Sequence, residues 1–139
     1  MRTEVFLDTA FAIALSSPND QFHRTALQLA DQIDKEGVRL ITTRAILLEI
    51  GNALSKLRHR EAAIQLLHAL EADSRVEIQP LSEHLYEQAL RLYRERPDKE
   101  WGLTDCVSFV VIQERGITDV LTTDEHFQQA GFRLLMRET

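Results

Sequence analysis

Short apolar runs alternate with longer amphipathic segments along the chain of 139 residues. Five of the apolar runs have the length and the sharp ends of strands. In the segments between them, apolar residues recur near every 3.6 positions, as in helices that bury one face. The predicted strands are 4–8, 38–42, 76–80, 119–123 and 132–136, and the predicted helices are 20–37, 43–57, 60–72, 82–96, 104–116 and 124–131.

Residues suited to helix ends stand at several of these boundaries. Gly37 and Gly116 are expected to stop two helices, and Ser82 and either Thr42 or Thr43 to cap two others. Strands that alternate with helices require crossover connections, which favour a mostly parallel sheet covered on both faces. The chain length suits one domain, so we predict a single α/β domain over residues 1–139.

Composition narrows the class of protein. The net charge of −6 argues against coating nucleic acid by bulk electrostatics, but not against an enzyme that holds phosphates through metal ions. No apolar run reaches the length of a membrane span, and the first 20 residues do not resemble a signal peptide. The single cysteine, Cys106, is expected to be a small core residue in a reducing compartment. We therefore expect a cytoplasmic location.

Four acids occupy positions that such a fold makes informative. Asp8 and Asp124 directly follow predicted strands, and Asp105 lies where a predicted helix opens. In parallel sheets, ligands bind beyond the carboxyl ends of the strands, so these side chains are expected to face one crevice. Glu49 is the one charge in an apolar helical segment, and a carboxylate beside a core needs a partner.

Converging carboxylates repel one another, and a hard cation such as Mg²⁺ or Mn²⁺ relieves that repulsion. Such ions activate water and stabilise the leaving oxygen in phosphodiester hydrolysis. Neighbouring hydroxyl and amide side chains are candidates to orient the carboxylates or bound waters. These are Thr9, Asn52, Thr104, Ser108 and Thr123.

Simpler explanations exist for each acid alone. Asp105 and Asp124 both suit helix N-caps, whose side chains accept hydrogen bonds from backbone N–H groups. Asp8 suits a turn after a strand, and Glu49 suits the rim of a core. The case for a metal site depends on all four residues together.

The order of these acids resembles the PIN-domain family and, within it, the VapC-type toxins. "FLDTAFAIAL" (6–15) is similar to the opening strand, Asp and short helix of the family, and "LLEIGNAL" (47–54) to its Glu-x-x-Asn segment. "LTDCVSF" (103–109) resembles the segment with the third acid, and "VLTTDEHFQQAGFRLL" (120–135) the closing Thr-x-Asp-x-x-Phe and Gly-Phe segment. The likeness covers essentially the whole chain.

The resemblance implies a three-layer sandwich with a mostly parallel sheet of about five strands and helices on both faces. It also implies a Mg²⁺- or Mn²⁺-dependent endoribonuclease whose metal-binding acids are Asp8, Glu49, Asp105 and Asp124. Further implications are a homodimer, an RNA substrate and, in toxin members, a cognate antitoxin that blocks the site. Phe109 departs from the small residue common in the family, and Ser108 stands near the place where some members have a further acid.

Two other functions stay open at this point. The chain resembles nucleases, but a catalytically silent module of the same fold would bind RNA or a protein partner without cutting. A phosphatase with a strand-end Asp nucleophile normally needs a second Asp two positions later, where this chain has Ala10.

Three features have both functional and structural interpretations. His126 is either a phosphate contact or a solvated histidine, and the basic cluster "KLRHR" (56–60) either steers RNA or is a solvated turn between two helices. Trp101 either stacks on a base or packs against the protein. In each case the structural interpretation is the simpler expectation.

Overall fold

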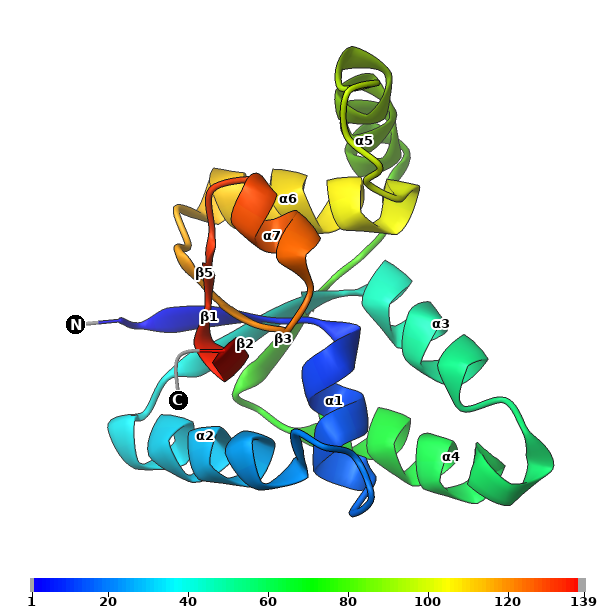
Figure 1. Cartoon of the computed structure of the whole chain (residues 1–139), viewed down its shortest axis with the longest axis vertical. Coiled ribbons are helices and arrows are strands. Elements are labelled where there is room, and N and C mark those ends of the chain that lie inside the picture. Colours follow the sequence, from blue (N-terminus) through cyan, green and yellow to red (C-terminus); the bar gives the residue numbers. More distant parts are fainter. Residues whose placement is uncertain (1, 138–139) are drawn as a thin grey trace.

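Five parallel strands form one sheet in the order β3-β2-β1-β4-β5 (Figure 1). The computed structural model describes residues 2–137. The predicted α/β class, the parallel sheet and the number of strands are confirmed. The strands are β1 (Glu4–Leu7), β2 (Arg39–Thr43), β3 (Val76–Gln79), β4 (Asp119–Leu121) and β5 (Arg133–Leu134).

The helices lie on both sides of this sheet. In Figure 1, α1, α2 and α4 lie on one side and α5, α6 and α7 on the other. Helix α3 packs against α1, α4 and α6, and therefore stands beside both groups. The helices are α1 (Thr9–Ser16), α2 (His23–Glu36), α3 (Arg44–Ala53), α4 (Leu57–Ala72), α5 (Glu83–Glu95), α6 (Leu103–Arg115) and α7 (Glu125–Gln129).

Several helix ends follow the predicted chemistry. Gly37 and Gly116 adopt left-handed backbone conformations, with φ of 66° and 67°, directly after α2 and α6. The side chains of Thr43 and Ser82 accept hydrogen bonds from backbone N–H groups in the first turns of α3 and α5. Glycine tolerates this conformation because it has no Cβ, and the hydroxyls satisfy orphan helix donors.

Some predicted boundaries were wrong. The predicted strand 132–136 is shortened to Arg133–Leu134, because the buried Leu135 and Met136 turn into a 3-10 helix that packs them in the core. The predicted helix 20–37 starts only at His23, because the Asp20 carboxylate accepts the Phe22 N–H in a turn.

The connection between α3 and α4 also differs from the sequence prediction. Helix α3 ends at Ala53 instead of residue 57, and α4 begins at Leu57 instead of residue 60. The basic cluster 56–60 is therefore not a turn between two helices. Lys56 is the N-cap of α4, and the rest of the cluster forms its first turn. Among residues 2–137, no helix is long and apolar enough to cross a bilayer.

Buried side chains of the sheet and of the helices on its two faces form the core. Four aromatic residues in this core or packed against it come from α6, α7 and the chain next to them. Phe109 packs edge-on against Trp101 and against Phe127, with ring centroids 5.0 Å apart in each pair, and Phe132 lies 5.7 Å away. The large residue at position 109 therefore fills a space that these aromatic rings share. This packing fixes α6 and α7 relative to each other.

Candidate metal centre

The chain order of the strands changes direction beside β1. Strand β1 pairs with β2 on one side and β4 on the other, so the chain crosses over β1 between β3 and β4. At such a switch in direction, the loops after neighbouring strands leave toward opposite faces and open a site at the carboxyl edge. Asp8 follows β1 directly, and its N–H donates to the carbonyl of Leu121, the last residue of β4 (3.3 Å).

Asp8 is the buried acid of this edge, with 6 % of its surface exposed. Its Oδ2 accepts a hydrogen bond from the Thr122 hydroxyl at 2.7 Å. Burial raises the pKa of Asp8 to about 7, the Thr122 hydroxyl and the Thr9 N–H oppose that rise, and the carboxylates of Glu49 and Asp105 add to it. The strand-end position places a carboxylate where its negative charge is poorly solvated and close to two others.

Glu49 reaches the same edge from α3. Its Oε1 accepts a hydrogen bond from the Thr9 hydroxyl at 2.6 Å. Since Thr9 follows Asp8 in the chain, this bond joins the first turn of α1 to the middle of α3. The partner that the sequence required for Glu49 is thus in part a hydroxyl, and the carboxylate keeps a second oxygen without a hydrogen bond among residues 2–137.

Asp105 lies in the first turn of α6, with Gly102 as the N-cap. Its Oδ2 accepts hydrogen bonds from the Gly102 N–H and from the Nδ1–H of His126, both at 3.1 Å. The capping interpretation is therefore correct in part: the Asp105 carboxylate accepts a backbone N–H at the helix start, although Gly102 and not Asp105 is the N-cap. The negative charge of Asp105 also contributes to the raised pKa of the buried Asp8.

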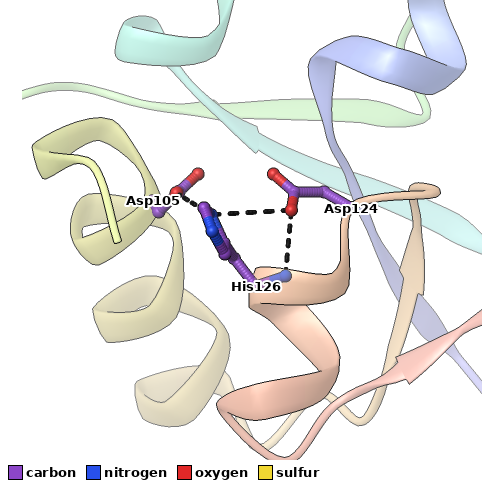
Figure 2. A group of neighbouring side chains, drawn as sticks. All are labelled: Asp105, Asp124 and His126. Atoms are coloured by element: carbon purple, nitrogen blue, oxygen red, sulfur yellow. Dashed lines mark hydrogen bonds and ion pairs between the residues drawn. The ribbon is translucent and has the colours of Figure 1, made fainter. Parts of the chain in front are cut away.

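Asp124 is the N-cap of α7, and its Oδ1 accepts the backbone N–H of His126 at 2.9 Å. His126 Nδ1 lies 3.6 Å from that same oxygen. Figure 2 shows the imidazole standing between the carboxylates of Asp105 and Asp124. Ligand atoms of these three residues all lie within 4.8 Å of one another. Asp124 thus caps a helix and belongs to the cluster at the same time.

The predicted supporting residues divide into two groups. Thr9 contacts Glu49, as described. Thr104 and Thr123 are partly buried and Asn52 is exposed, and among residues 2–137 none of their side chains hydrogen-bonds to an acid. Ser108 is fully buried, and its hydroxyl has no partner in the described part of the chain.

Two residues at the centre were not predicted in these positions. Thr122 rather than Thr123 holds Asp8, and its oxygen also accepts the Asp124 N–H at 3.1 Å. The Thr-x-Asp spacing was the signal for this contact. His126, expected to be solvated, keeps 32 % of its side chain exposed but binds Asp105 across 21 residues of sequence.

Trp101 and Cys106 are both core residues in this fold, as the simpler expectation for each predicted. Trp101 is buried, and its Nε1–H donates to Gln129 at 3.0 Å while Arg96 lies over its ring. Cys106 is buried and unpaired, and burial raises the pKa of its thiol to about 11. Neither side chain presents reactive or stacking surface to the acids.

The donor set fits a hard divalent cation. One oxygen each of Glu49, Asp105 and Asp124 has no hydrogen-bond donor among residues 2–137, so three carboxylates keep a free lone-pair face. Asp8 is buried with a raised pKa, and a cation beside it would favour its ionised form. Oxygen donors gathered in this way are the ligands that Mg²⁺ and Mn²⁺ prefer.

Comparison with known proteins agrees with the fold. The PIN domain family model matches residues 5–133. Two relatives, both named 23S rRNA-specific endonuclease VapC20 and from Mycobacterium tuberculosis strains CDC 1551 / Oshkosh and ATCC 25618 / H37Rv, are 29% identical over 128 residues. The match covers 92% of this chain and 95% of each relative.

Solved structures of known proteins share this fold. The crystal structure of Mycobacterium tuberculosis VapC20, described as a sarcin-ricin loop cleaving toxin, matches with a TM-score of 0.83 and 26% identity, over 93% of this chain and 96% of that one. FitAcB from Neisseria gonorrhoeae matches with a TM-score of 0.66 and 20% identity, over 94% and 95%. At that lower identity the likeness concerns the fold alone.

Proposed function

Because the chain belongs to the PIN-domain family and is a homologue of VapC-type endonuclease toxins, we propose that it is a metal-dependent endoribonuclease that hydrolyses RNA phosphodiester bonds. Asp8, Glu49, Asp105 and Asp124 hold Mg²⁺ or Mn²⁺. The convergence of these four carboxylates at the carboxyl edge of the sheet carries the proposal. The PIN family implies a divalent cation, and the identity of the ion and of its ligands is what we add.

Each residue of the site has a task that its contacts support. The Thr122 and Thr9 hydroxyls hold the carboxylates of Asp8 and Glu49 in fixed rotamers. The Gly102 N–H aims Asp105 from the start of α6. When bound, the cation supplies activated water and neutralises charge on the scissile phosphate. The side chains themselves would orient the ion and the water.

We propose ribosomal RNA as the substrate class, since the named relatives act on 23S rRNA and on its sarcin-ricin loop. The test incubates the purified protein with a 23S rRNA fragment and with tRNA, with Mg²⁺, with Mn²⁺ and with a chelator. We expect cleavage of the rRNA fragment that needs the metal and that Asp8→Asn abolishes. Asp31→Asn, an exposed acid on α2, is the matched control and should cut like the wild type.

A specific result would contradict this function. If the wild type binds RNA but cuts no fragment with either metal, the silent binding module becomes the better interpretation. If it cuts tRNA and leaves the rRNA intact, the nuclease function stands and the substrate class is wrong.

We also propose a cytoplasmic toxin that works as a homodimer and is held inactive by a cognate antitoxin. Leu48 in the middle of α3 and Leu57 at the start of α4, which are 61% and 89% exposed, provide apolar surface for such contacts. Light scattering should give twice the chain mass, and Leu57→Asp should reduce it if that leucine lies in the dimer. Expression should arrest growth, and coexpression of a cognate antitoxin should relieve the arrest.

A further inference from the structure

His126 stands where a metal ligand would stand, between two of the four acids. Its Nδ1 is 3.1 Å from Asp105 Oδ2 and 3.6 Å from Asp124 Oδ1. In octahedral coordination at about 2.1 Å from the ion, neighbouring ligand atoms are about 3.0 Å apart. Nδ1 therefore lies close to this spacing from Asp105 and somewhat beyond it from Asp124, and ligand atoms of all three residues lie within 4.8 Å of one another.

The fold holds the imidazole in this place. The backbone N–H of His126 donates to Asp124, which fixes the first turn of α7. The next residue, Phe127, is fully buried and packs edge-on against Phe109 of α6. The side chain of His126 thus projects from a short helix that is anchored against α6, the helix that carries Asp105. The arrangement does not depend on a mobile surface side chain.

We propose that His126 supplies a nitrogen ligand beside Asp105 and Asp124, in the neutral tautomer that carries its proton on Nε2 and leaves the Nδ1 lone pair free, and that this ligand makes the site prefer Mn²⁺ over Mg²⁺. This inference rests on the proposed function, because it concerns the ion of the same site. From the sequence we expected oxygen ligands alone. Imidazole suits first-row transition metals, whereas Mg²⁺ prefers oxygen and keeps its waters. Replacing one oxygen donor by nitrogen therefore shifts the balance between the two ions.

A different role for His126 predicts a different outcome. If the imidazole only shields the two carboxylates from each other, removing it leaves metal affinity equal or higher for both ions. If it only positions Asp105 by its hydrogen bond, removing it weakens both ions by the same factor. Only a nitrogen ligand changes the ratio of the two affinities.

The test measures the binding of Mn²⁺ alone and of Mg²⁺ alone by calorimetry on the full chain. In His126→Asn the amide nitrogen stands as many bonds from Cβ as Nδ1 does, so a donor to Asp105 is kept while the imidazole is lost. We expect the Mn²⁺ affinity to fall about 10-fold or more and the Mg²⁺ affinity to fall much less. His68→Asn, an exposed histidine on α4, is the control.

Pulsed electron paramagnetic resonance of the Mn²⁺-loaded protein provides a second readout. We expect a coupling to ¹⁴N in the wild type and in His68→Asn, and its loss in His126→Asn. Absence of the coupling in the wild type, or an unchanged ratio of Mn²⁺ to Mg²⁺ affinity in His126→Asn, overturns the inference.

RNA cleavage, measured separately, distinguishes this inference from the proposed function. A wild type that shows the ¹⁴N coupling but cuts no RNA contradicts the nuclease and supports the ligand. A wild type that cuts RNA while His126→Asn keeps the same metal ratio contradicts the ligand alone.

Discussion

The two edges of the sheet both gather acids, but they treat them in opposite ways. At the amino edge, Arg115 donates to Glu4 and to Glu77 at 2.6 Å, and Arg2 lies 3.0 Å from Asp119. The Arg115 guanidinium lowers the pKa of Glu77. Each of these acids has a permanent cation, so the cluster is complete within the protein.

At the carboxyl edge, the acids receive hydroxyls, backbone N–H groups and one imidazole. The pKa of the buried Asp8 is raised to about 7 instead of being lowered. Arginine at the amino edge satisfies its acids and so stabilises the fold. The opposite edge leaves negative charge unsatisfied at some expense of stability, which is what a site for an external cation requires.

Replacing the buried Asp8 should give the largest difference in activity between the two edges. Asp8→Asn should reduce cleavage at least about 100-fold, since it removes a ligand and the negative charge that attracts the ion. Glu4→Gln at the amino edge is the matched control and should leave cleavage within about twofold. Rates with saturating RNA at fixed Mn²⁺ measure both. Equal losses in the two variants would contradict the distinction between the edges.

Asp8 should also make stability depend on pH. Its pKa is about 7 in the folded protein and near 3.8 when exposed, so between these values the folded state binds more protons than the unfolded state. Stability should therefore fall as pH rises from about 4 to 7, and more steeply than in Asp8→Asn. Urea unfolding at several pH values, without metal, measures the slopes. Equal slopes of stability against pH in the wild type and in Asp8→Asn would mean that folding does not raise the pKa of Asp8.

Thr122 is expected to orient the acids of the carboxyl edge, as Arg115 does for the acids of the amino edge. Thr122→Val removes the donor to Asp8 and the acceptor for the Asp124 N–H. We expect metal affinity to fall about 10-fold, because both carboxylates lose their fixed orientation. Calorimetry with Mn²⁺ measures it. Thr123→Val, one residue on and without such bonds, should bind like the wild type, and a similar loss there would contradict this role.

Sequence reasoning predicted the places of Asp8, Asp105 and Asp124 because strand ends and helix starts are local features, and it singled out Glu49 as the one charge in an apolar helix. "EVFLD" and "DVLTT" place Asp8 and Asp124 by their own patterns, and a parallel sheet then brings them to one edge. The contacts that finish the site are not local. His126 meets Asp105 only because aromatic packing sets α7 against α6, and nothing in the spacing of either segment encodes that meeting.

The choice between neighbouring hydroxyls failed for a similar reason. Thr123 is next to Asp124 in sequence, but the extended chain after β4 alternates direction, and Thr122 is the residue turned toward Asp8. Asn52 and Ser108 were predicted to support the site because they lie near the acids on a helix. In the structure Asn52 is exposed, and Ser108 is buried without a hydrogen-bond partner among residues 2–137. Adjacency fixes which residues are near a site, and packing fixes which of them contact it.

Removing the arginine of the amino-edge cluster should lower stability and leave metal binding unchanged. Arg115→Gln leaves Glu4 and Glu77 without their shared guanidinium, and we expect a loss of about 1 kcal/mol in the free energy of unfolding. Urea unfolding at neutral pH measures it, and Mn²⁺ calorimetry should give an unchanged affinity. A large change in metal affinity would mean that α6 transmits strain from one edge to the other.

The smallest effect should come from Trp101, which lies just before the helix that carries Asp105. Its Nε1–H donates to Gln129, Arg96 lies over its ring and the residue is 6% exposed, so little ring surface remains for a base. Trp101→Phe keeps the aromatic packing and loses one hydrogen bond, worth about 1 kcal/mol of stability. RNA affinity, measured by fluorescence anisotropy with a non-cleavable substrate, should change less than twofold, because base–aromatic stacking would be worth about 1–3 kcal/mol. A 10-fold loss of affinity in a variant with nearly normal stability would mean that the indole moves out of the core to meet RNA.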